Sequence, residues 1–152
     1  MRNQNYFPRA YAVIHGGSTH PNISGIANFY SPPDSPGVLI EVELTNLPTR
    51  TESCPYFLGL HLHETGDCNN NFNNTGMHYN PENTEHPCHA GDFPSILNNN
   101  GYAYLAFYDA FLSLDDVTNR SIVVHDRRDD FTSQPAGDSG TKIACGVIRT
   151  YK

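Results

Sequence analysis

The alternation of apolar and polar residues along the chain is mostly typical of β-strands. Ile40, Val42 and Leu44 alternate with Glu41 and Glu43, which is the pattern of a strand with one buried face. We expect seven strands, separated by turns rich in Gly, Pro and Asp, over residues 10–14, 24–30, 38–44, 57–63, 102–107, 121–125 and 142–148. No helix of useful length is expected. The pattern therefore predicts an all-β sandwich or barrel.

Two long segments interrupt this rhythm of short strands. Residues 64–100 are polar and rich in asparagine, and residues 126–141 are charged and contain Gly and Pro. Irregular stretches of this length inside a compact domain usually carry function. We therefore expect the chemistry of this protein in these two loops.

Length and charge narrow the class of protein. A chain of 152 residues suffices for one domain, and we expect a single domain over 1–152 with its core over about 10–148. The net charge of −7 argues against a nucleic-acid partner, which requires Lys and Arg. No apolar run reaches the length of a membrane span, and the polar start of the chain carries no secretion signal. We expect a cytoplasmic protein, or an exported one if a leader has been removed.

Four cysteines, Cys54, Cys68, Cys88 and Cys145, leave the disulfide pattern open. Four cysteines allow three pairings, and their long spacings exclude a CxxC redox or zinc-finger motif. Cys88 can compete for a metal ion, bond to Cys54 or remain a free thiol.

Six histidines and one aspartate form a pattern typical of metal ligands. His61 and His63 are two residues apart on an expected strand, so both imidazoles project from one face. The others lie in the first long loop or end a strand, and imidazole with carboxylate suits copper and zinc. Unrelated surface or core histidines would explain one such residue, but far less readily a set that consists of His61, His63, His78, His86, His89, Asp92 and His125.

These residues resemble the copper-zinc superoxide dismutase family over nearly the whole chain, from about residue 10 to 148. The resemblance rests on five segments: Gly-Leu-His-Leu-His-Glu at 59–64, His-Tyr-Asn-Pro at 78–81, the zinc loop at 86–92, Val-Val-His at 123–125 and Ala-Cys-Gly-Val-Ile at 144–148. It implies a Greek-key β-sandwich or flattened barrel of about seven to eight antiparallel strands, with two long functional loops.

The resemblance also implies two metal sites that share one ligand. Copper would be the redox centre, and zinc, with four protein ligands and no open position, would be structural. His78 would bridge the ions and take a proton when copper is reduced. The implied copper ligands are His61, His63, His78 and His125, and the implied zinc ligands are His78, His86, His89 and Asp92.

Three further roles follow from the resemblance. Asp129 would link ligands of the two metals, and Cys68 would form a disulfide with Cys145, in a placement similar to the bacterial branch of the family. Lys142 stands where the family usually has an arginine that attracts the anionic substrate. Lysine keeps the charge but loses the planar fork, so we expect lower efficiency than with arginine. Arg127 and Arg128 either add to this positive field or are ordinary surface charges.

The implied activity is the disproportionation of superoxide to dioxygen and hydrogen peroxide, by a monomer or a homodimer. One alternative is a non-catalytic copper- and zinc-binding protein on the same fold, which loss of a copper ligand would favour. Another is a copper-chaperone domain, which would need an added metal-delivery domain for which we expect no room. The four histidines at the copper positions favour the enzyme.

Overall fold

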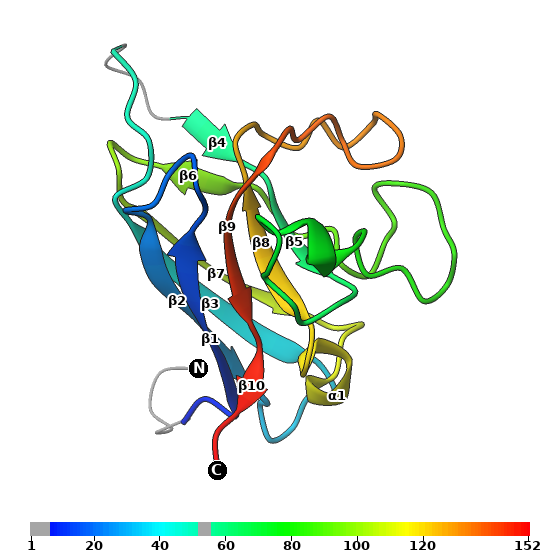
Figure 1. Ribbon diagram of the computed structural model, residues 1–152. Helices are drawn as coiled ribbons and strands as arrows, with labels where there is room; N and C mark the ends of the chain where they lie inside the picture. The colour runs from blue at the N-terminus through cyan, green and yellow to red at the C-terminus, as the bar shows by residue number, and fades with distance from the viewer. Residues whose placement is uncertain (1–6, 52–55) are drawn as a thin grey trace.

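Antiparallel strands make up nearly all of the regular structure in the computed structural model, which describes residues 7–51 and 56–152. The main sheet has eight strands in the order β5-β8-β9-β1-β2-β3-β7, with β10 paired to β1 (Figure 1). β3 pairs with β7 although three strands lie between them in sequence, which is a Greek-key crossover. The strands are β1 (Ala10–Gly16), β2 (Ser24–Tyr30), β3 (Val38–Thr45), β5 (Leu60–His63), β7 (Ala103–Asp109), β8 (Ser121–His125), β9 (Lys142–Val147) and β10 (Arg149–Thr150).

A second, two-stranded sheet of β4 (Tyr56–Leu58) and β6 (Ile96–Asn98) completes the architecture. β6 contacts β7, and β4 leads into β5, so the small sheet connects the two ends of the curled main sheet. The fold is thus the flattened barrel expected from the sequence. Helical structure in the described residues is limited to α1 (Leu114–Val117) and the 3-10 turn η1 (Asn73–Thr75), and neither is long enough to span a membrane.

The strand expected over residues 57–63 is wrong in one respect, because Gly59 divides it between the two sheets. The Gly59 amide donates to the Arg127 carbonyl at 2.7 Å, and its own carbonyl accepts from the His125 amide at 2.9 Å. A Cβ at this position would lie 3.0 Å from the Ser139 Cβ and 3.1 Å from the Arg127 oxygen. Glycine therefore allows the second long loop to lie directly against the start of β5.

The core lies inside the curled sheet, on alternate positions of each strand. Leu60 and Leu62 of β5 join this core, as do Ile122 and Val124 of β8. Each fully buried side chain of this kind contributes about 1.5–3 kcal/mol. Strand alternation then directs His61 and His63 to the opposite face of β5, where they are also buried.

The two long loops cover that opposite face. Figure 1 shows both of them beside β5, β8 and β9, the first in green and the second in orange. The first loop is fastened to β5 by backbone hydrogen bonds, from the Tyr79 amide to the Leu62 carbonyl (2.8 Å) and from the Leu62 amide to the Gly91 carbonyl (2.9 Å). The fold therefore buries two strand histidines under the histidine-rich loop.

Candidate metal centre

Four histidines meet where β5 and β8 run under the first long loop. His61 and His63 come from β5, His125 ends β8, and the backbone of His78 bridges to that of His63. One ring nitrogen from each of the four lies within 4.8 Å of those of the others. All four residues are buried, with at most 4% of their surface exposed.

A second group of ligand atoms shares His78 with the first. Nitrogens of His78, His86 and His89 and a carboxylate oxygen of Asp92 also lie within 4.8 Å of one another. Asp92 is central, since its oxygens lie 2.7 Å from the His78 Nδ1, 3.0 Å from the His86 Nδ1 and 3.2 Å from the His89 Nδ1. His78 therefore directs Nδ1 to the second group and leaves Nε2 facing the first.

Several buried ring nitrogens have no hydrogen-bond partner, and this observation indicates whether the two groups fit metal ions. Four such atoms occur in the described residues: Nδ1 of His61, Nε2 of His78, Nδ1 of His86 and Nδ1 of His89. Asp92 approaches the last two at 3.0 Å and 3.2 Å, but neither contact is a hydrogen bond. A buried polar atom without a partner is costly, and native proteins rarely keep one. Each of the four belongs to one of the two convergent groups, so both groups fit a cation.

The Nδ1 atoms of His63 and His125 are oriented by backbone carbonyls that motif reasoning did not identify. The His63 Nδ1 donates to the Gly76 carbonyl at 2.9 Å, and the His125 Nδ1 lies 3.3 Å from the Gly140 carbonyl. These contacts turn the two Nε2 atoms toward each other at 3.2 Å. Two nitrogen ligands of one ion at about 2.0–2.1 Å lie at a similar separation, so this geometry also fits a metal.

Burial favours the neutral form of three of these imidazoles, those of His61, His63 and His125. Removal from water lowers the pKa of His61 and lowers the pKa of His63 and His125 well below the ordinary histidine value. A neutral imidazole offers the lone pair that a metal ion requires. The site is thus prepared to bind cations rather than protons.

Asp129 joins the two groups from outside. Its carboxylate accepts from the His61 Nε2 at 2.7 Å and from the His86 Nε2 at 2.9 Å, which fixes both tautomers with Nδ1 directed inward. Burial raises the pKa of Asp129, but the hydrogen bonds from His61, the Phe131 amide and His86 outweigh this and lower it to about 2. The expected link by Asp129 thus corresponds to two direct hydrogen bonds.

Substitution of Asp129 by asparagine is expected to weaken metal binding at both groups by about 10–100-fold, because outer partners of ligating histidines contribute that much. Competition with a chromophoric chelator measures the affinity for each ion. Asp34→Asn, an equivalent change at an exposed site, is the control. Equal affinities for Asp129→Asn and the unmodified chain would contradict the role of this carboxylate.

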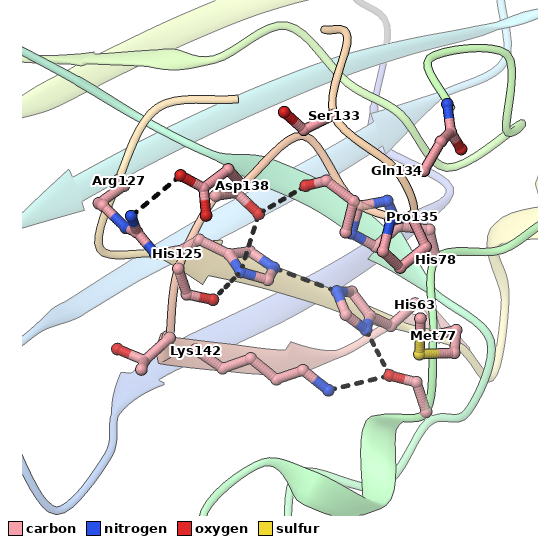
Figure 2. Close-up of a pocket in the computed structure, with 15 residues that line it drawn as sticks. His63, Met77, His78, His125, Arg127, Ser133, Gln134, Pro135, Asp138 and Lys142 are labelled. Carbon is pink, nitrogen blue, oxygen red and sulfur yellow. Dashed lines mark hydrogen bonds and ion pairs between the residues drawn. The ribbon is translucent and has the colours of Figure 1, made fainter. Parts of the chain in front are cut away.

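Lys142 lies on the wall of an open cleft of about 580 Å³ that leads to the first group (Figure 2). Its ammonium donates to the Thr75 Oγ1 at 2.8 Å and the Gly76 carbonyl at 2.9 Å, with a longer contact to the Phe72 carbonyl at 3.4 Å. Half-burial lowers its pKa. Lys142 is thus a fixed charge that also holds the Gly76 carbonyl against His63.

The two arginines of the second loop differ in their position relative to this cleft. Arg127 lines the cleft and pairs with Asp138, as Figure 2 shows. The Arg127 Nη1 lies 3.1 Å from the Asp138 Oδ2. Arg128 does not line this cleft, but it lines two other hollows, one of which it shares with Arg127. Of the two positive charges considered in the sequence, only Arg127 is placed to act on the cleft.

A disulfide connects Cys68 of the first loop to Cys145 of β9, with 5.9 Å between the Cα atoms. This is the pairing that the resemblance implied. Cys88 is exposed, outside both ligand groups, and has no disulfide partner among the described residues. Cys54, considered as its partner, lies outside those residues.

Comparisons with known proteins agree with this geometry. The family model described as copper/zinc superoxide dismutase matches residues 23–148. The chain is 37% identical to a Legionella pneumophila protein named superoxide dismutase [Cu-Zn], over 74% of this chain and 71% of the relative. It is 34% identical to Aquifex aeolicus superoxide dismutase [Cu-Zn] 1, over 74% of this chain and 73% of the relative. It is also 34% identical to the human copper chaperone for superoxide dismutase, over 62% of this chain but 39% of the relative.

Proposed function

The chain belongs to the copper/zinc superoxide dismutase family, and we propose that the two convergent groups are its copper and zinc sites. The protein is an oxidoreductase that disproportionates superoxide and uses copper and zinc as cofactors. The observation that carries the site assignment is His78, whose two ring nitrogens face different groups. Copper is assigned to His61, His63, His78 and His125, and zinc to His78, His86, His89 and Asp92.

The two ions have different roles in the proposed function. Copper, when bound, supplies the change of oxidation state that removes an electron from one superoxide and gives it to a second. The zinc group offers four protein ligands, as structural zinc sites do, and all come from the loop that covers β5. We assign it the structural role of holding His78 and Asp92 in place.

The chain itself supplies orientation, charge and a proton site. The Gly76 and Gly140 carbonyls orient His63 and His125, and Asp129 orients His61. The Nε2 of His78 is buried at the inner end of the cleft and is the atom that can hold and release a proton for the peroxide product. Lys142 provides positive charge on the cleft wall for an anionic substrate.

Substitution of Lys142 by glutamine is expected to lower the dismutation rate about tenfold and to weaken its dependence on salt, because charge in a cleft raises the capture of a small anion. Pulse radiolysis of the metal-loaded protein over a range of ionic strength measures both effects. Lys152→Gln, at an exposed site, is the control for net charge. A Lys142→Gln rate with unchanged magnitude and salt dependence would contradict the steering role.

The substitution Lys142→Arg keeps the positive charge and changes only the shape of the group that carries it. We propose that arginine at this position raises the rate, since its planar fork can hold an anion at two points.

Each site draws all its assigned ligands from one chain, which supports function as a monomer or as a homodimer of independent centres.

A further inference from the structure

Three arginines and two aromatic residues line a second hollow. It shares only Arg127 with the copper cleft, which is the open cleft beside Lys142 that leads to the proposed copper site. This arginine pocket has a volume of about 360 Å³, within the usual range for small-molecule sites of roughly 300–1,000 Å³. Its residues come from the segment after β3, from β4 and from the start of the second long loop. They are Arg50, Tyr56, Phe57, Arg127 and Arg128.

A cation–π contact and several hydrogen bonds position residues of the pocket. The Arg50 guanidinium carbon lies 3.7 Å from the ring centroid of Tyr56, a cation–π contact, and the Tyr56 hydroxyl donates to the Pro48 carbonyl. The backbone of Arg127 accepts from the Gly59 amide at 2.7 Å and donates to the Ser139 carbonyl at 3.0 Å. These contacts position Arg50, Tyr56 and the backbone of Arg127.

Positive charge in the arginine pocket is only partly compensated. The protein has a net charge of −7, yet three of its nine Lys and Arg residues line this hollow. Within residues 7–51 and 56–152, Arg127 pairs with Asp138, whereas Arg50 and Arg128 form no ion pair. Among the described residues, the side chains that line the pocket include no acid, although Asp129 and Asp130 line an adjoining hollow with Arg128.

The acids next to Arg128 in sequence form no ion pair with it in the described residues, and their carboxylates are hydrogen-bonded to other groups. The Asp129 carboxylate binds His61 and His86. The Asp130 carboxylate accepts from the Thr132 amide and from the amide and hydroxyl of Ser133.

We propose that the arginine pocket binds a phosphate monoester that carries a planar ring. Guanidinium groups present paired donors that match phosphate oxygens, which favours a phosphate group over a monovalent ion. Phe57 is 50% exposed beside these donors and offers an aromatic face for the ring of the ligand. Because Arg127 also lines the copper cleft, an occupied pocket neutralises charge at the cleft rim.

Calorimetric titration of the copper- and zinc-loaded protein with phenyl phosphate tests the proposal. Phenyl phosphate should bind more tightly than inorganic phosphate, and phenol should not bind. Arg128→Gln should weaken phenyl phosphate binding about tenfold, the effect of losing one charge-assisted hydrogen bond. Arg149→Gln, an equivalent change at an exposed site on β10, should leave it unchanged.

Lys142→Gln distinguishes this pocket from the copper cleft as the location of the anion. Binding that survives Lys142→Gln and is weakened by Arg128→Gln supports the proposal. Binding that is lost with Lys142→Gln and unaffected by Arg128→Gln places the anion in the cleft and overturns it. Absence of phenyl phosphate binding at millimolar concentration also overturns it.

Discussion

Replacement of His78 by glutamine is expected to reduce dismutation to the rate of free copper and to weaken binding of both metals. The reason is that one imidazole presents a nitrogen to each group, Nε2 to the first and Nδ1 to the second. Glutamine cannot provide two nitrogen lone pairs on opposite sides of a ring. Since loss of an outer partner alone costs about 10–100-fold in affinity, loss of a shared ligand should cost more.

Elemental analysis and a superoxide assay on the same preparation measure this effect. His61→Gln is the informative comparison, because His61 belongs only to the first group. This variant should have a lower copper content and an unchanged zinc content. His15→Gln changes an exposed histidine outside both groups and should change neither metal. Full zinc and copper content in His78→Gln would contradict the assignment of a shared ligand.

Removal of the Cys68–Cys145 disulfide is expected to lower the free energy of unfolding by about 2–5 kcal/mol. The bond closes a ring over a sequence separation of 77 residues, for which the chain-entropy estimate is close to the upper end of that range. It also fastens the loop whose Gly76 carbonyl orients His63, next to a small cluster of Phe72, Val123 and Cys145. Loss of the bond should therefore loosen the copper site as well.

Urea unfolding of the double variant Cys68→Ala/Cys145→Ala, with copper and zinc bound, measures the change in stability. Cys88→Ala is the matched control, since Cys88 is exposed and has no disulfide partner in the described residues. An unfolding midpoint equal to that of the unmodified chain would show that the disulfide contributes nothing to stability.

The residues of the metal centre could be predicted because few arrangements bring so many imidazoles together. Two histidines at positions i and i+2 of a strand must share a face, so His61 and His63 follow from local geometry alone. The strands over 24–30 and 121–125 follow from their β-prone composition and match β2 and β8 at both ends. The other candidate ligands followed from their clustering in one loop and at a strand end, and their assignment to copper or zinc needed the family resemblance.

Features that depend on the folded backbone were not predicted. The break at Gly59 results from close approach of the second long loop, and β6 has only three residues, too few for a periodic pattern. The contacts of Gly76 and Gly140 with His63 and His125 use main-chain carbonyls, which any residue carries. Similarly, adjacency in sequence could not show that both Arg127 and Arg128 line the arginine pocket whereas only Arg127 also lines the copper cleft.

Metal content measured together with dismutation shows whether the two ligand groups are a catalytic copper site and a zinc site. The protein is loaded with copper and zinc, freed of excess ions, and assayed in the same sample by elemental analysis and pulse radiolysis. The site geometry predicts about one copper and about one zinc per chain, with turnover well above that of the same amount of free copper. Zinc without copper, or both metals without turnover above free copper, would contradict it and favour a metal-binding protein without this activity.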